Sequence, residues 1–235
     1  ARMRAEAALR TAHDELERRV EERTTELNRG RQRERVLNTL LLLSMEDLSL
    51  EQQLERALHE IVSIPWLPVQ PQAAIFLVGE DPETLELRAR HGLDQAAQGD
   101  CERISFGQCL CGRAAASGEL LFAEHGDERH EIEHEDHTPH NHYCVPILSD
   151  GKSIGTLTLY LERGRPRDTQ QEEFLQAIAH TLAGIIERKR VEEALRQSEG
   201  QLQEVNEQLA RHGRELEQKV AERTHEIEQR RQVAE

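Results

Sequence analysis

The sequence predicts an α+β fold, in which an antiparallel sheet with helices on one face is flanked by long N- and C-terminal coiled-coil helices. Two features of the 235-residue chain lead to this prediction. Between residues 71 and 160, apolar residues form short runs or alternate with polar ones, as in β-strands. Before and after this stretch, apolar residues recur every three or four positions, which is the period of a helix.

The two ends of the chain resemble each other. In residues 1–32 a narrow apolar seam follows a charged helix, which is the pattern of a coiled coil. The segment 15–27 returns as 215–227 with its seam positions matched, and Val20 and Val220 both follow an additional four-residue step. Charged helices can be alike through composition alone, but matched seam positions favour a repeat.

This repeat predicts the domain organisation. We expect an N-terminal coiled-coil helix over 1–32, a compact domain over 33–187 and a C-terminal coiled-coil helix over 188–235. Parallel coiled coils at both ends predict a homodimer. The chain has the pattern of one link in a longer array, which predicts a downstream output domain in the full-length protein.

Caps and turn residues divide the compact domain into elements. Ser49 with Gln52 forms a capping box that begins a helix, and this helix must end before Pro65. Asp168 with Gln171 begins the final helix in the same way. Strands are expected at 74–78, 85–89, 120–122, 143–148 and 153–160, a short helix at 112–116 and a hairpin turn at 149–152.

Charge and hydropathy exclude several classes of partner. The net charge of −15 disfavours binding to nucleic acid or to an anionic membrane surface, since both require a basic face. No segment approaches the roughly 20 consecutive apolar residues that membrane insertion needs, and no signal peptide is visible. A cytoplasmic location is therefore expected, and there cysteines are usually reduced and available as ligands or reactive thiols.

All four cysteines and six of the twelve histidines lie between residues 101 and 144. Cys109 and Cys111 stand two positions apart at the start of the expected short helix, where backbone N–H groups favour a thiolate. His140, His142 and Cys144 alternate along a strand, so their side chains should project to one face. This density of sulfur and nitrogen donors predicts a metal site.

Two thiolates, imidazoles from the strand and His130 from the connecting loop could enclose a tetrahedral ion, either zinc or iron. The spacing is not that of a zinc finger. The predicted metal ligands are Cys109, Cys111, His130, His140, His142 and Cys144. No catalytic residue and no other cofactor are predicted.

Two alternatives for this cluster remain open. The thiols could be small core residues beside a solvated histidine loop. They could also form a redox switch without a metal. A disulfide between Cys109 and Cys111 would be strained at that separation, so Cys101 or Cys144 would be the better partner.

The segment His130–His134 also satisfies the metalloprotease pattern H-E-x-x-H. That pattern requires a helix in a catalytic cleft, whereas a loop crowded with acidic residues is expected here. A hydrolase is therefore disfavoured.

Three segments resemble a known family. The runs 103–115, 127–131 and 139–147 are similar to a GAF sensor domain of bacterial signalling proteins, in a subgroup with Cys-x-Cys-Gly and His-x-His-Tyr motifs. The likeness covers about residues 33–190. It implies a cytoplasmic sensor that feeds a histidine kinase or a cyclic-di-GMP enzyme, and the flanking Glu-Arg-Thr segments are similar to signalling helices.

Two functions follow as expectations. The first is a non-enzymatic sensory module, in which an event at the Cys/His cluster shifts the helices around Leu54 and Ile178, and parallel coiled coils pass this shift on. The second is a structural dimerisation spacer without a signal of its own. The sequence favours the first.

Overall fold

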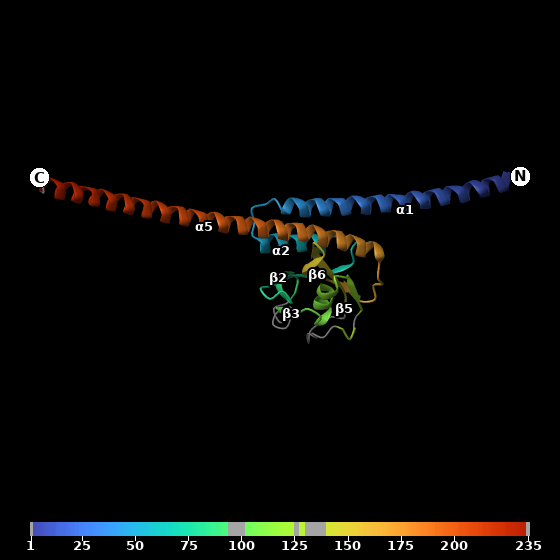
Figure 1. Ribbon diagram of the computed structural model, residues 1–235. Coiled ribbons are helices and arrows are strands. Elements are labelled where there is room, and N and C mark those ends of the chain that lie inside the picture. The colour runs from blue at the N-terminus through green and yellow to red at the C-terminus, as the bar shows by residue number, and fades with distance from the viewer. Residues whose placement is uncertain (1, 94–101, 125–126, 130–139, 234–235) are drawn as a thin grey trace. The chain divides into compact units, whose positions relative to one another are not determined.

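The computed structural model describes residues 2–93, 102–124, 127–129 and 140–233 (Figure 1). Contacts divide the chain into two compact units, Ala1–Ile186 and Glu187–Glu235. The elements in chain order are α1 (Arg2–Leu43), α2 (Leu50–Val62), β1 (Val69–Val78), β2 (Thr84–His91), β3 (Arg103–Ser105), α4 (Cys109–Ser117), β4 (Leu121–Ala123), β5 (His140–Ser149), β6 (Lys152–Glu162) and α5 (Thr169–Val233).

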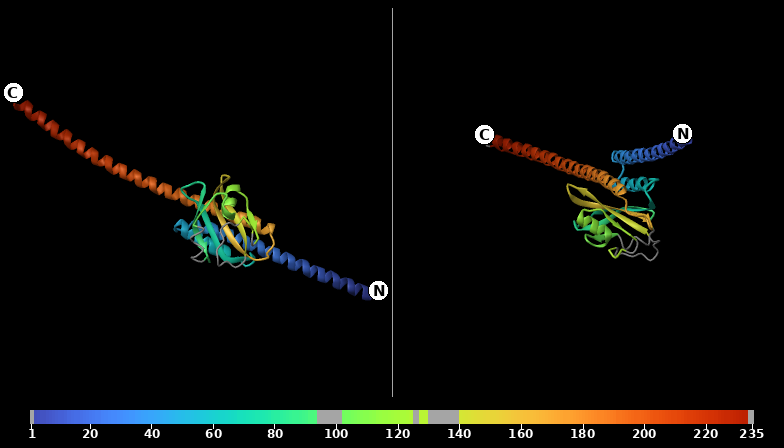
Figure 2. Two further views of the ribbon diagram at one scale, coloured as in Figure 1. Left: turned by 90° about the horizontal axis from the view of Figure 1, so that it is seen from below. Right: turned by 90° about the vertical axis from the view of Figure 1, so that its right-hand side faces the viewer.

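The six strands form one antiparallel sheet in the order β3-β2-β1-β6-β5-β4. This confirms the predicted α+β class with an antiparallel sheet. Helix α2 and the first part of α5 pack on one face, as expected, and the short helix α4 packs on the other face (Figure 2). The sheet is therefore covered on both sides, and the second cover is the helix that begins with the Cys-x-Cys segment.

Strand β1 shows how one strand serves both faces. Ala73, Ile75 and Leu77 join the larger apolar core beneath α2 and α5. Ala74 and Phe76 join a smaller core beneath α4. Successive side chains of a strand point to opposite sides, so an uninterrupted apolar run indicates a strand that is buried on both faces.

The predicted capping box of α2 is confirmed. The Gln52 backbone N–H donates to Ser49 Oγ at 3.2 Å, and the Ser49 N–H donates to Gln52 Oε1 at 3.1 Å. The hairpin between β5 and β6 is confirmed as well. Its turn residues Asp150 and Gly151 both have positive φ, 47° and 75°, as a two-residue turn of this kind requires.

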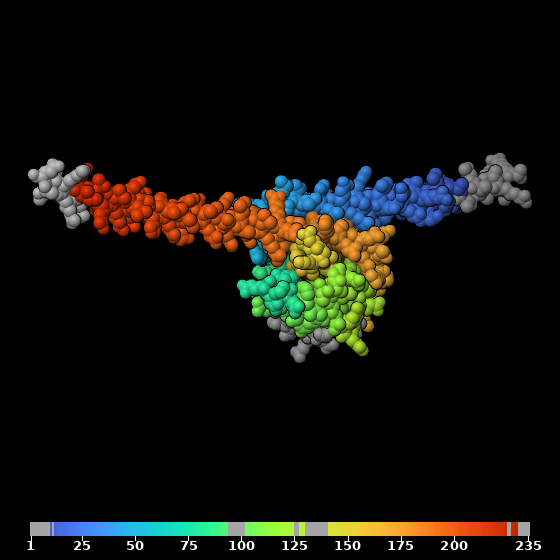
Figure 3. All heavy atoms as spheres, viewed as in Figure 1, coloured from blue at the N-terminus to red at the C-terminus, as the bar shows by residue number. Residues whose placement is uncertain are grey.

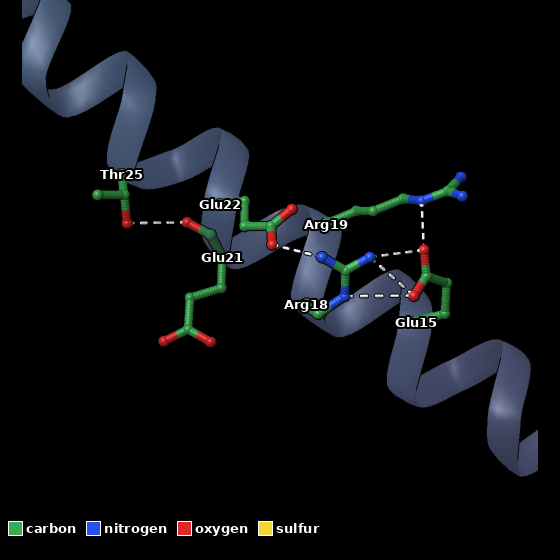
Figure 4. A network of polar contacts seen from close by, with 6 residues as sticks. All are labelled: Glu15, Arg18, Arg19, Glu21, Glu22 and Thr25. Carbon is green, nitrogen blue, oxygen red and sulfur yellow. Dashed lines mark hydrogen bonds and ion pairs between the residues drawn. The ribbon is translucent and has the colours of Figure 1, made fainter.

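Most of α1 stands at the surface (Figure 3) and is held as a helix by its own charged side chains. The guanidinium of Arg18 pairs with Glu15 and Glu22, and Arg19 also pairs with Glu15 (Figure 4). Pairs at these helical spacings stabilise an isolated helix only slightly, by about 0.2 to 0.5 kcal/mol each. They indicate an exposed helix rather than a core helix.

The C-terminal half of α1 is fastened to the domain by Arg33. Its guanidinium carbon lies 5.2 Å from the Trp66 ring centre and 5.7 Å from that of Phe174, and Arg33 Nη2 donates to the Gln170 carbonyl at 3.2 Å. Further along the helix, Leu40 is fully buried in the larger core. This part of α1 therefore belongs to the folded domain.

Large apolar side chains remain exposed along the predicted seams. They are Leu16, Val20 and Leu27 on α1, and Val191, Leu195, Leu202, Val205, Leu209, Leu216, Val220 and Ile227 on α5. Along the part of the chain that is described, no helix combines the length and the apolar character needed to cross a membrane.

Candidate functional site

Strand β5 carries alternating side chains with different roles. His142 and Cys144 are 5% and 1% exposed and point to the α4 side of the sheet. Tyr143 between them is fully buried in the core under α2 and α5. The predicted placement of His142 and Cys144 on one face is thus confirmed. On the neighbouring strand β6, Thr158 stands opposite Cys144 in the strand register.

A tight approach of backbone segments positions the Cys-x-Cys helix. The Gly107 N–H donates to the Gly112 carbonyl at 2.9 Å, and a β-carbon added at Gly112 would lie only 2.1 Å from the Ser105 carbonyl oxygen. Only glycine fits such an approach. Cys109, the first residue of α4, has a positive φ of 50°, which is uncommon outside glycine. The start of α4 is therefore fixed against the end of β3.

This arrangement brings two predicted ligands together. The sulfur atoms of Cys111 and Cys144 lie 3.8 Å apart, and both side chains are buried. Thr158 Oγ1 lies 3.1 Å from the Cys111 sulfur and 3.9 Å from the Cys144 sulfur. We call these two sulfurs the dithiol pair. It is a soft, buried centre with one hydroxyl in hydrogen-bonding range.

The electrostatics of the pair differ from the expectation for a helix start. The pKa of Cys111 is raised well above its usual range, first by the hydrogen bond with the Cys144 thiol and then by burial. The prediction that backbone N–H groups would favour a thiolate is therefore wrong for Cys111. Desolvation disfavours a charged sulfur, and the neighbouring thiol adds to this effect.

Arg129 is held at the end of β4. The Arg129 guanidinium donates two hydrogen bonds to Asp127, at 2.9 and 2.6 Å, and one to the Phe122 carbonyl at 3.3 Å. The pKa of Arg129 is raised, mainly by its hydrogen bond to Asp127. The guanidinium is thus paired with a carboxylate and with the backbone of β4.

The remaining predicted ligands are distributed as follows. Cys109 is buried in the same small core. The His142 ring packs against Tyr160 with ring centres 4.7 Å apart. His130 lies outside the described residues, and for His140 only the backbone, at the start of β5, is described. Within the described ranges, no three His, Cys, Asp or Glu side chains come close enough together to hold a metal ion.

Sequence reasoning missed Thr158. The residue is one of several threonines in a strand, and nothing in the pattern marks it. Its role depends on the register that places it opposite Cys144 and on the packing of Cys111 above it. A correctly paired hairpin register could have identified the first of these contacts, but not the second.

Strand β5 is also linked to the beginning of α5. The Asp168 backbone N–H donates to the Tyr143 hydroxyl at 3.2 Å, and Asn141 Nδ2 donates to the Arg165 carbonyl at 3.0 Å. Asp168 in turn caps α5 by accepting the Gln170 N–H at 2.8 Å. The residues on either side of His142 therefore hold the segment that starts the final helix.

The comparison with protein families matches a GAF domain model over residues 47–187. The chain belongs to the GAF domain family. Such domains are sensory or regulatory modules, which agrees with the resemblance seen in the sequence. No curated protein matches this chain.

Solved GAF domains share the fold. That of a phosphoenolpyruvate-protein phosphotransferase from Coxiella burnetii is 20% identical, with a TM-score of 0.59 and coverage of 69% of this chain and 97% of that one. A further GAF domain structure is 25% identical, with a TM-score of 0.54 and coverage of 65% and 88%.

The free methionine-R-sulfoxide reductase of Neisseria meningitidis is 22% identical, with a TM-score of 0.53 and coverage of 67% of this chain and 90% of that chain. This neighbour is an enzyme, so the GAF fold by itself does not distinguish a sensor from a catalyst. Any distinction must come from the chemistry of the site.

Proposed function

We propose that this GAF domain is the cytoplasmic sensory module of a bacterial signalling protein, such as a histidine kinase or a cyclic-di-GMP enzyme. Its sensing centre is the dithiol pair, which binds a zinc or iron ion. The observation that carries the proposal is the meeting of Cys111 and Cys144, from a helix and a strand, in a buried position.

The spacing of the two sulfurs supports a metal. Two thiolates bound at about 2.3 Å to one tetrahedral ion lie about 3.8 Å apart. The sulfur atoms of Cys111 and Cys144 are separated by 3.8 Å without any rearrangement. A bound cation would also offset the unfavourable burial of sulfur charge, because metal binding replaces the thiol protons.

The other donors would come from the predicted set. His142 lies on the same face of β5 as Cys144, two residues before it in the strand. Cys109, His130 and His140 complete the candidates. Thr158 would orient a metal ligand, because its hydroxyl is within hydrogen-bonding range of the Cys111 sulfur.

The contacts of β5 supply a route for the signal. Cys144 adjoins Tyr143, and the Tyr143 hydroxyl accepts the backbone N–H of Asp168 at the cap of α5. Movement of β5 on metal binding would therefore act on the start of α5. A sensor needs such a connection between its ligand site and a bistable output element.

The output would be a parallel homodimer that joins a downstream domain. The exposed seam on α5 places Leu195, Leu202, Leu209 and Leu216 seven positions apart, and each is more than half exposed in the single chain. A second copy would bury these leucines in a coiled coil. The change Leu209→Asp should then shift the molecular mass measured by light scattering towards the monomer, whereas Ala210→Asp, outside the seam, should not.

Metal analysis tests the proposal directly. Protein purified without oxygen or chelator should contain zinc or iron in stoichiometric amount. The variants Cys111→Ser and Cys144→Ser should lose it, and Cys101→Ser, which removes a thiol outside the predicted ligand set, should retain it. Metal-free wild-type protein, or equal metal content in all variants, would contradict the proposal and favour a dimerisation spacer.

A further inference from the structure

The dithiol pair has a second chemical capacity besides metal binding. Cys109, Cys111 and Cys144 are all buried, and the sulfur atoms of Cys111 and Cys144 lie 3.8 Å apart. The two residues are 33 positions apart in the sequence and come from different elements. A bond between them would therefore join α4 to β5.

We infer that the dithiol pair is a site of oxidative modification, at which a peroxide converts Cys111 and Cys144 into a disulfide that excludes the metal. The modification itself rests on the sulfur geometry alone. Only the exclusion of the metal rests on the proposed function. The oxidant class is a small peroxide, such as hydrogen peroxide.

The reaction is balanced by the two thiols. One sulfur attacks a peroxide oxygen, the O–O bond breaks, and a sulfenic acid and water form. The second sulfur then attacks the sulfenic sulfur, the S–O bond breaks and a second water leaves. The two cysteines lose two electrons and two protons, and one hydrogen peroxide becomes two waters.

The surroundings determine which element must move. A disulfide requires the sulfurs to approach to about 2.05 Å. Cys144 lies in β5, which is hydrogen-bonded to β4 on one side and β6 on the other. Cys111 lies in α4, a helix of nine residues that is bounded by Gly107 and Gly118, both with positive φ. A shift of β5 would disturb its pairing with two strands, whereas α4 has no ladder to break, so oxidation should draw Cys111 towards the sheet while the start of α4 stays fixed against β3.

The metal-bound and oxidised states cannot coexist. A thiolate ligand binds a metal through an electron pair, and a disulfide sulfur has given up the charge that makes it a ligand. The spacing also differs, since the tetrahedral arrangement keeps the sulfurs about 3.8 Å apart. Oxidation should therefore release the ion, and the bound ion should slow oxidation.

Peptide mapping tests the modification. Folded protein is treated with hydrogen peroxide, free thiols are blocked, and the protein is digested with trypsin without reduction. The peptides 104–113 and 130–152 should appear as one cross-linked species, lighter by two hydrogens than the sum of the two peptides once the blocking group on the remaining thiol of 104–113 is counted. Since 104–113 contains both Cys109 and Cys111, variants must separate them.

The expected pattern is specific. Cys111→Ser and Cys144→Ser should abolish the cross-link, whereas Cys109→Ser and Cys101→Ser should retain it. Loss of the cross-link in Cys109→Ser with retention in Cys111→Ser would overturn the inference, as would free thiols in folded wild-type protein under conditions that oxidise the urea-unfolded chain. The unfolded sample serves as the control for reactivity.

A metal-release measurement separates this inference from the proposed function. Zinc-loaded protein should release one equivalent of zinc to a coloured chelator for each disulfide formed. A protein that never binds metal but forms the cross-link refutes the proposed metal centre and supports the modification site. A protein that binds metal and never forms the cross-link refutes the modification site and supports the proposed metal centre. Retention of zinc in cross-linked protein overturns the exclusion of the metal.

Discussion

The two faces of the sheet come from the same strands but carry different chemistry. The face beneath α2 and α5 is packed with leucine, isoleucine and alanine, and its buried Tyr143 directs a hydroxyl to the cap of α5. The face beneath α4 holds the dithiol pair, Thr158 and the tilted, contacting rings of His142 and Tyr160. Both faces have an apolar core, but the larger core lies beneath α2 and α5 and the thiol pair lies beneath α4.

In the proposed sensor, this difference would connect the dithiol pair to α5. Residues that follow each other on β5 belong to opposite faces. Tyr143 and Cys144 are therefore bonded neighbours in the chain, but their side chains pack in different cores. A displacement of Cys144 would therefore also displace Tyr143, whose hydroxyl accepts the Asp168 N–H. The predictions below test whether the two faces are separable in stability and in chemistry.

The largest expected effect is on the face beneath α2. Leu54 is fully buried in the larger core, so Leu54→Ala should lower the free energy of unfolding by about 2 to 5 kcal/mol, through lost burial and a cavity. Met45→Ala, at a side chain that is 69% exposed, should change it by less than about 0.5 kcal/mol. Urea denaturation measures both, and similar losses for the two variants would contradict the assigned core.

The next effect is expected at the start of α4. Gly112→Ala should lower the free energy of unfolding by about 1 to 3 kcal/mol, because the new methyl group meets the Ser105 carbonyl. It should also reduce the yield of the Cys111–Cys144 cross-link. Gly184→Ala, in α5 with nothing within 4 Å of the added carbon, should instead stabilise the helix by about 0.5 to 1 kcal/mol.

The dithiol pair should make stability depend on alkaline pH in reduced, metal-free protein. The pKa of Cys111 is higher in the folded chain, so the unfolded chain loses this proton first as pH rises. The contribution of the Cys111 thiol to the free energy of unfolding is fully present below about pH 8.5. As the pH rises further, it is lost by up to about 1.4 kcal/mol per pH unit. Urea titrations at several pH values should show a steeper loss for wild type than for Cys111→Ser, and parallel curves would contradict the assignment.

The smallest effect is expected for the link between β5 and α5. Tyr143→Phe removes the hydroxyl that accepts the Asp168 N–H and keeps the buried ring, so it should cost about 0.5 to 1.5 kcal/mol. Metal content and cross-link yield should stay at wild-type values, because the hydroxyl lies on the opposite face from the sulfurs. A loss of either would mean that the two faces are not chemically separate.

Local features of the structure were predictable from the sequence. The capping box at Ser49 and the hairpin turn at Asp150 each depend on a few neighbouring residues, and both were found as predicted. The placement of His142 and Cys144 on one face follows from the two-residue period of a strand. The fold class followed from the change of period along the chain.

The sequence by itself thus determined the elements, the antiparallel α+β class and the face of β5 on which the donors stand, because these depend on backbone geometry over short distances. Only the tertiary structure decided that Cys111 meets Cys144, that Thr158 joins them and that the Cys144 thiol and burial raise the pKa of Cys111. These facts depend on how α4 packs against the sheet. Packing brings together residues that are far apart in the chain, and no local pattern encodes which of several sulfurs will meet.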